Sequence, residues 1–383
     1  MKQGNPNRIL AIDLARGVAV SLMILSHGIK GLLSFEQFPQ WGLVPIHLIT
    51  KFSSTVFFMT FGLSLAVAFA PATENTEFWP QKRNKLLLRG LTILFWYKVL
   101  TVIEMSHLHN PREIFDALIY RDFPSYAEIL GFYALALLWF PFLLPVWQRS
   151  SRLMKALWPL GFGILSLGIS RYVDFGGSQQ IKALLVEDSN FYTWGQISRA
   201  PLVFLGMFLG SFLINNYSNF RRRFKLSGIL AGIAALLFTT FMIIYNQELY
   251  STFEALALNE GKHPPELAFL LFSLSGAFGI FAITFFIGDK GAKWLAPFTL
   301  IGKDTLSAFI FHLTVLFIFY RYLFDLWLKV SYPEAMALTI LLMGMTALWI
   351  KFKVWRKQYE EHQVPSGRHA HPRNLKPREL SAN

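Results

Sequence analysis

The chain has 383 residues, of which 54% are hydrophobic and 15% charged, and its net charge is +13. Soluble domains carry about 25% charged residues, so this composition excludes an ordinary water-soluble protein and indicates one that lies in lipid. The absence of cysteine excludes disulfides, thiolate metal sites and a cysteine nucleophile. The basic residues fall in alternate loops and form no single face interleaved with aromatics, which argues against a nucleic-acid partner.

Apolar segments long enough to cross a bilayer recur along the chain, because a helix needs about 20 such residues to do so. The first segment is too long for a signal-peptide core and contains Asp13 and Arg16, so we expect it to remain as the first span. We therefore predict an all-α polytopic membrane helix bundle that occupies residues 1–355 as one domain. Its spans, about ten, are expected at 11–33, 46–70, 86–104, 126–147, 153–172, 197–216, 226–246, 265–287, 303–324 and 333–355.

Lys and Arg gather in every second loop, around residues 82–85, 149–155, 221–225 and 290–293. The positive-inside rule assigns these loops to the cytoplasm, and an even number of spans then predicts that both termini lie there too. The connections around 34–45, 105–125, 173–196, 247–264 and 325–332 are expected to face outward. Trp147 and Trp194 lie near predicted span ends, where an indole prefers the membrane interface.

The segment 356–383 is basic and has no apolar period, so we expect a disordered, lipid-attracted cytoplasmic tail. Glycines four residues apart, Gly206 with Gly210 and Gly228 with Gly232, predict close helix packing in lipid. Such contacts serve packing within one chain or within a homo-oligomer equally well.

Charged groups inside a span are costly, so each is a candidate for function, and the first span holds the densest set. Asp13, Arg16 and His27 share one helix face, because eleven residues at 100° each return to within about 20° of the start. Arg16 and His27 would lie about 16 Å apart along the axis. His27 is the group suited to proton transfer at neutral pH. The alternative is a salt bridge between Asp13 and Arg16 that only fixes topology, with His27 bonded to a neighbouring helix.

Several other spans carry ionisable residues in their predicted outward halves. Glu128 opens the fourth span, where its carboxylate is expected to orient His27 or to hold an acceptor hydroxyl. His312, Lys51 and Arg199 are candidates for substrate binding, and His312 for a share in proton transfer. The alternative is internal ion pairing, Lys98 with Glu104 and Glu128 with Arg199.

The first-helix sequence Arg8-Ile-Leu-Ala-Ile-Asp13-Leu-Ala-Arg16-Gly17, with ten residues between Arg16 and His27, resembles the signature of transmembrane acyltransferases of the acyltransferase-3 family. The segment Phe57-Phe58-Met59-Thr60-Phe61-Gly62 is similar to the Phe-rich second helix of those proteins. Lys262-His263-Pro264-Pro265-Glu266-Leu267 and Leu300-Ile301-Gly302-Lys303-Asp304-Thr305-Leu306 resemble bacterial relatives of heparan-alpha-glucosaminide N-acetyltransferase.

The resemblance implies transfer of an acyl group, expected to be acetyl, from cytoplasmic acyl-CoA to a hydroxyl or amine of a sugar or glycan outside. Arg16, Arg89 and Lys303 lie at predicted cytoplasmic span ends, where they would pair with the donor's phosphates. Asp13, Arg16, His27 and Glu128 are then the candidate catalytic residues, with His27 as general base or transient acyl carrier. We expect no metal cofactor, membrane lipids as neighbours, and a location in the plasma membrane, which is the inner membrane of a bacterium.

Two other functions compete with this one. A secondary transporter also needs buried charges, but it predicts related halves and paired broken helices, and the sequence shows no internal repeat. A structural membrane subunit would use the in-span charges only as contacts between helices. The number of ionisable residues inside the spans argues against that reading.

Overall fold

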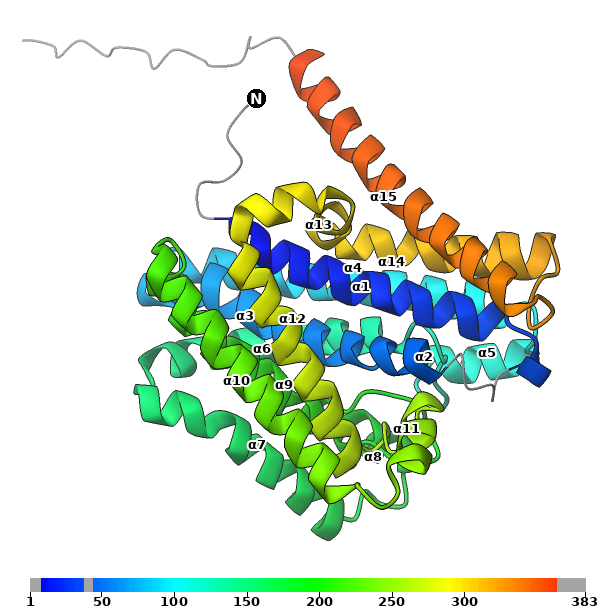
Figure 1. The fold of residues 1–383 in the computed structure, drawn as a ribbon, viewed down its shortest axis with the longest axis horizontal. Helices are drawn as coiled ribbons and strands as arrows, with labels where there is room; N and C mark the ends of the chain where they lie inside the picture. The colour runs from blue at the N-terminus through cyan, green and yellow to red at the C-terminus, as the bar shows by residue number, and fades with distance from the viewer. Residues whose placement is uncertain (1–7, 38–43, 364–383) are drawn as a thin grey trace, which may run out of the picture.

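The computed structural model describes residues 8–37 and 44–363. Within them the named regular elements are all helices, and ten helical segments are long and apolar enough to cross a membrane. The predicted all-α polytopic bundle is therefore confirmed (Figure 1). The elements are α1 (Leu10–Leu32), η1 (Phe35–Gln37), α2 (Val44–Thr50), α3 (Phe52–Ala68), η3 (Ala70–Glu74), α4 (Trp79–Met105), α5 (Pro111–Leu118), α6 (Glu128–Arg149), α7 (Arg152–Tyr172), α8 (Gln179–Val186), α9 (Gln196–Asn216), α10 (Phe220–Ile244), α11 (Leu249–Ala257), α12 (Leu267–Trp294), α13 (Ala296–Lys303), α14 (Thr305–Thr314), η4 (Val315–Leu323) and α15 (Tyr332–Gln363).

Two of the predicted spans are interrupted, and both interruptions lie beside functional candidates. The second predicted span consists of α2 and α3, which meet at Lys51. The ninth was expected to begin at residue 303, but α13 ends there and α14 begins at Thr305, after the N-cap Asp304. The α14 helix then continues into the π-helical segment η4. Stretches of π-helix are rare and occur frequently at functional sites.

The helices divide into a buried core and a lipid-facing shell. About 61% of the most apolar window of α1 is buried, whereas only 6% of that of α7 is. The α7 helix and the neighbouring α10 lie at the edge of the bundle (Figure 1), with apolar side chains such as Leu160 and Ile164 exposed. Since lipid tails are as apolar as leucine, these side chains need no protein partner.

A glycine pair lets α1 and α13 cross in backbone contact. A Cβ added to Gly302 would stand 1.7 Å from the carbonyl oxygen of Asp13, and one added to Gly17 would stand 1.8 Å from that of Phe298. Both glycines belong to the motifs that carry the family resemblance. The close crossing holds Arg8 and Arg16, the charged residues near the two ends of the first-helix motif, against α13.

The predicted packing role of small residues is right for one pair and wrong for the other. Gly206 and Gly210 face the backbone of α3, with a Cβ on Gly206 only 2.0 Å from the carbonyl oxygen of Met59. Gly228 and Gly232 have no atom within 4 Å of an added Cβ among the described residues. They lie on α10, which packs against α12 through other residues, such as Ser227, whose hydroxyl donates to the carbonyl of Ala282 at 2.9 Å.

The last span is longer than the sequence indicates. The α15 helix continues past residue 355 as far as Gln363, so the start of the predicted tail, 356–363, is helical. The rest of that tail, 364–383, lies outside the described residues. Ten helices of this kind are consistent with the prediction that both termini lie on one side of the membrane, and that this side is the cytoplasm stays a prediction.

Candidate active site

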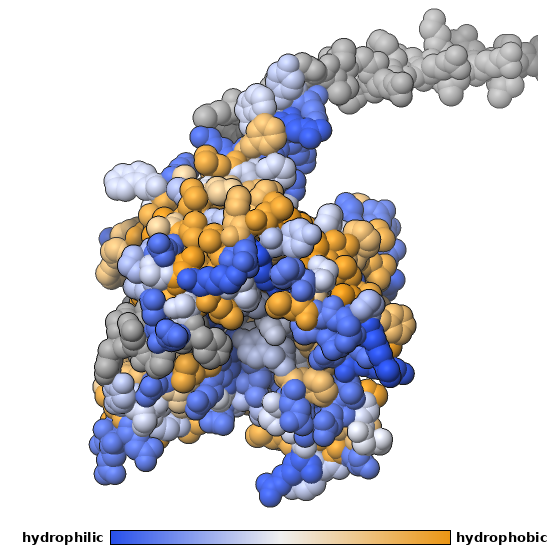
Figure 2. Space-filling model, turned by 90° about the vertical axis from the view of Figure 1, so that its right-hand side faces the viewer, coloured by the Kyte–Doolittle hydropathy of each residue, from blue (hydrophilic) through white to orange (hydrophobic). Residues whose placement is uncertain are grey.

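Two cavities lie inside the bundle at successive levels of α1. The first, here called the outer cavity, has a volume of about 250 Å³ and lies beside the connections that the sequence predicts to face outward. Seen from that end, polar residues gather around the middle of the molecule while apolar residues cover its flanks (Figure 2). The outer cavity is lined by Met23, Ser26, His27, Lys30, Thr50, Lys51, Ser53, Ser54, Ser125, Tyr126, Glu128, Ile129, Tyr192, Trp194, Asn259 and Lys262.

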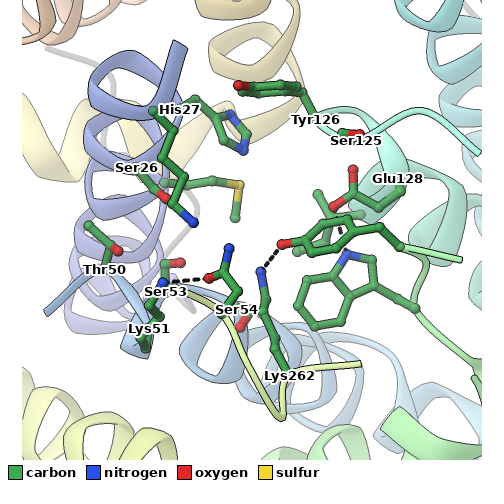
Figure 3. A pocket seen from close by; sticks show the side chains of 16 residues that line it. Ser26, His27, Thr50, Lys51, Ser53, Ser54, Ser125, Tyr126, Glu128 and Lys262 are labelled. Carbon is green, nitrogen blue, oxygen red and sulfur yellow. Dashed lines mark hydrogen bonds between the residues drawn. The ribbon is translucent and has the colours of Figure 1, made fainter. Parts of the chain in front are cut away.

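His27 stands on the cavity wall (Figure 3), and a second histidine, His312, contacts it from outside the cavity lining. Its Nδ1 lies 3.2 Å from Nε2 of His312, whose own Nδ1 lies 2.8 Å from the carbonyl oxygen of Ala308. A carbonyl can only accept, so Nδ1 of His312 carries a proton, and in the neutral ring Nε2 is then an acceptor. His27 must therefore donate from Nδ1. The network assigns the free lone pair of His27 to Nε2, the atom available as a base.

His312 thus has a different place from the one expected of a substrate-binding residue. It is completely buried, contacts the Phe309 ring at 5.2 Å between centroids, and is absent from the residues that line the outer cavity. Its contact with His27 instead follows the arrangement in which a third group orients a catalytic base. His312 therefore lies where it can orient His27 and not where it can contact a substrate.

Glu128 does line the outer cavity, but it does not orient His27. Its Oε1 accepts from the indole Nε1 of Trp194 at 3.2 Å, and its buried Oε2 has no hydrogen-bond partner among the described residues. The predicted role of orienting His27 is therefore wrong, because His312 occupies that place. An unpaired carboxylate oxygen on the wall remains suited to hold an acceptor hydroxyl.

The segment that leads into Glu128 is held by a second carboxylate. Glu104 accepts from the backbone N–H groups of Ser125, Tyr126 and Ala127, at 2.7 to 3.3 Å. Its expected partner, Lys98, instead donates to the carbonyl of Ala117 at 3.1 Å. The suggested Lys98–Glu104 pair does not form, because Lys98 is bound to the backbone of α5 and Glu104 to that of the loop before α6.

Arg199 is another predicted substrate-binding residue that lies outside the cavity lining. It is 1% exposed and forms a two-contact pair with Glu187, at 2.5 and 2.8 Å. His263 Nδ1 also lies 3.0 Å from this carboxylate. Burial alone would raise the pKa of Glu187, but the Arg199 charge and the bond to His263 lower it to about 2. The alternative pair, Glu128 with Arg199, is therefore also wrong.

Three lysines reach the outer cavity, and only Lys51 was expected there from the sequence. Lys51 donates to the carbonyl of Ala257, at 2.9 Å, and to the side chain of Asn259. Lys262 donates to the hydroxyl of Tyr192, and Lys30 lines the wall one helical turn after His27. Lys262 was part of a quoted motif without a role, and Lys30 looked like an ordinary span-end charge.

The second cavity, here called the inner cavity, lies at the level of Arg16 and has a volume of about 140 Å³. Arg16 bonds the hydroxyl of Ser64 at 2.5 Å and the carbonyl of Gly302 at 3.3 Å. Arg89 lines the same cavity, so the structure brings these two predicted donor-binding residues together. Lys303 is exposed and does not line it; only its backbone carbonyl is bound, by Arg8.

Asp13 supports the arginines without lining either cavity. Its carboxylate takes two hydrogen bonds from Arg8, at 2.6 and 3.1 Å, and lies 3.8 Å from Arg16. The salt bridge considered from the sequence therefore exists, but its closer partner is Arg8. Asp13 is 4% exposed, so it acts by holding Arg16 in place.

Aromatic side chains separate the two cavities. Phe57, Tyr133 and Phe309 line the inner cavity, with ring centroids 4.9 Å apart for Phe57 and Tyr133 and 5.7 Å for Phe57 and Phe309. Phe309 also contacts His312. One ring therefore stands between the inner cavity and the histidine pair.

Among the described residues, no three His, Asp or Glu side chains are grouped as metal ligands would be. A comparison with curated proteins finds no significant match. The family model described as an acyltransferase domain does match, and it covers residues 9–352, which is nearly the whole described bundle with both cavities. The chain is a membrane protein of the acyltransferase-3 family.

Proposed function

We propose that this protein transfers an acyl group, acetyl being the expected one, from acyl-CoA at the inner cavity to a sugar hydroxyl or amine in the outer cavity. The observation that carries the proposal is the His27–His312–Ala308 chain, which presents an unprotonated Nε2 to the outer cavity. A base for the acceptor and a cationic site for the donor then lie on one face of α1, as the sequence predicts.

The inner cavity has the chemistry that a CoA thioester needs. Arg16 and Arg89 offer guanidinium groups to phosphates, and the aromatic lining suits an apolar arm. Eleven residues of α1 separate Arg16 from His27, about 16 Å along the axis. The extended pantetheine arm is the part of the donor that would cover this distance, past Phe309.

In the direct route, the acceptor oxygen or nitrogen attacks the thioester carbonyl carbon while Nε2 of His27 takes its proton. The C–S bond then breaks, and the departing thiolate of CoA takes that proton back. In the second route, Nε2 attacks the carbonyl carbon and the C–S bond breaks, so that CoA leaves as its thiolate. The acceptor oxygen or nitrogen then attacks the acyl-histidine carbonyl, His27 is released, and the acceptor proton neutralises the thiolate. The products and the proton balance are the same.

The first test compares wild type with His27→Ala in detergent, by measuring acetyl-CoA binding and acetyl-CoA consumption with pooled envelope glycans. The variant should bind the donor within about twofold of wild type and lose at least about 10²-fold in turnover, the low end of a general base's contribution. His109→Ala, an exposed histidine paired with Glu113, is the matched control and should keep full activity.

Failure of folded wild type to bind acetyl-CoA, or full turnover by His27→Ala, would overturn the proposal. Exchange of labelled CoA into acetyl-CoA without an acceptor separates the two routes. Exchange that needs His27 indicates the acyl-histidine, and its absence indicates direct transfer. A secondary transporter remains the competing function and predicts solute uptake without thioester consumption.

A further inference from the structure

The outer cavity carries more positive charge than a neutral sugar requires. Lys30, Lys51 and Lys262 come from α1, from the break between α2 and α3, and from the loop before α12. Glu128 is the one carboxylate among the residues that line the cavity. Three ammonium groups therefore line a space with a single opposing charge. Figure 3 shows two of these lysines, Lys51 and Lys262, on the cavity wall.

These ammonium groups are not neutralised by the protein. Lys51 and Lys262 donate to a carbonyl, an amide oxygen and a phenol, all uncharged. Lys30 lies within hydrogen-bonding reach of the side chain of Lys51, another amine, and none of the three lysines forms a salt bridge among the described residues. Charge held in a partly buried site without a counter-ion is costly, and an anionic ligand removes that cost.

The titration of Lys262 agrees with this reading. Burial, together with the nearby charge of Lys30, lowers the pKa of Lys262 to about 7. Glu128 and Glu187 oppose this shift, and Arg199 adds to it. Lys262 also stacks at 4.8 Å from the ring centroids of both Tyr192 and Trp194, which fix the direction in which it points.

The charges have a fixed relation to the base. Lys30 follows His27 by three residues on α1, so their Cβ atoms lie about 5–6 Å apart. Serine and threonine hydroxyls, two phenol rings and one indole ring line much of the rest of the wall, which suits the hydroxyls and the face of a sugar ring. An acidic group bound by the lysines would place a hydroxyl of the same or the next sugar at His27.

We propose that the acceptor is an acidic sugar, whose carboxylate or phosphate is held by Lys30, Lys51 and Lys262 while its hydroxyl or amine meets His27. This inference rests on the proposed function for the identity of the reaction, but the anion site itself can be tested without turnover. Carboxylate and phosphate share the chemistry that the lysines recognise, and separate probes distinguish them.

The experiment measures binding of three probes to the full-length protein in detergent without a donor: glucuronate, its uncharged methyl ester, and glucose 6-phosphate. At pH 6.5, at least one anionic probe should bind at least about 10-fold more tightly than the ester. Lys30→Gln should remove most of that difference and leave binding of the ester unchanged, while Lys30→Arg should restore it.

Lys329→Gln is the matched control, because this lysine lies on the same end of the molecule but pairs with Asp325 outside the cavity. Raising the pH from 6 to 8.5 should weaken anion binding in wild type, since Lys262 loses its proton around pH 7. In Lys262→Met the loss of anion affinity between pH 6 and 8.5 should be smaller than in wild type, whatever the overall affinity of the variant.

Equal binding of the anions and the ester, or equal loss of both in Lys30→Gln, would overturn the acidic-sugar inference. The two proposals can fail separately. Lysine-dependent anion binding without any thioester consumption would leave the anion site standing and remove the acyltransferase role of His27. Acetyl transfer to neutral sugars with no preference for charge would leave the acyltransferase role standing and remove the anion site.

Discussion

At the scale of single residues, the buried carboxylate of Glu187 organises one wall of the outer cavity. It accepts from Arg199, His263 and Ser198, and from the backbone N–H of Gly195. Arg199 in turn donates to the carbonyl of Lys262. The pair therefore places Lys262 at the cavity without touching the space inside it.

Replacement of Glu187 by Gln should destabilise the protein by about 3–5 kcal/mol, because it leaves the buried Arg199 without a counter-charge. The double variant Glu187→Leu/Arg199→Met should recover much of that loss. Thermal unfolding in detergent measures both. The folded pKa of about 2 lies below the usual 4.5, so the wild-type contribution is complete above pH 4.5 and is lost as the pH falls towards 2.

The Glu187→Gln variant should not show this loss of stability as the pH falls from 4.5 towards 2. An Arg199→Met protein of wild-type stability with a raised KM for the acceptor would instead show that Arg199 binds substrate, as the sequence alone suggested.

Sequence reasoning found His27 because a histidine inside a span has few inexpensive explanations, and its spacing from Arg16 is distinctive. It could not find His312 as the partner, since the two are 285 residues apart and meet only in the fold. Lys30 was missed because a lysine at a span end is expected from membrane topology alone. Local pattern thus singled out the candidate base, while its neighbours required tertiary structure.

At the scale of helices, apolar length predicted the spans and said little about breaks within them. A helix that ends and restarts inside an apolar segment, as at Lys51 and Asp304, leaves hydropathy almost unchanged. Trp147 and Trp194, expected at the lipid interface, are 1% and 3% exposed. Trp194 instead bonds Glu128, a contact that no periodicity indicates.

The crossing of α1 and α13 gives a prediction at this scale. Gly302→Ala should destabilise the protein by about 1–3 kcal/mol through overpacking, because its Cβ would enter the backbone of α1. It should also weaken acetyl-CoA binding, since the Gly302 carbonyl is a partner of Arg16. Gly168→Ala on α7, where a Cβ meets nothing within 4 Å, is the control for thermal unfolding and donor affinity. Equal melting temperatures for the two variants would contradict the tight crossing.

At the scale of the whole molecule, two cavities share one core and one aromatic partition. In the proposed reaction, donor and acceptor would reach the centre from opposite ends, and we expect the aromatic partition to keep water in the outer cavity from the inner one. The family match covers both compartments together, which fits a reaction that needs both.

Phe309→Ala should therefore raise acceptor-independent hydrolysis of acetyl-CoA several-fold, because removing the ring opens a path for water. Phe319→Ala, in η4 but 43% exposed, should leave hydrolysis at the wild-type rate. Release of free CoA without any acceptor measures the effect, and Phe309→Leu should lie between wild type and alanine. Unchanged hydrolysis in folded Phe309→Ala would show that this ring does not separate the cavities.

The length of α15 has a consequence for how the protein meets its surroundings. Its 32 residues make a rod of about 48 Å, whereas the hydrocarbon layer is about 30 Å thick. Up to about 18 Å of helix therefore extends beyond the hydrocarbon layer, after the aromatic pair Trp349 and Phe352. In Figure 1 this end of α15 projects from the bundle. Lys353 lies where the protruding part of α15 begins. It pairs with Asp304, the N-cap residue of α14 beside the inner cavity. A reporter or affinity handle fused directly after Gln363 would start from the far end of this protruding helix. It should therefore leave access to the inner cavity unobstructed.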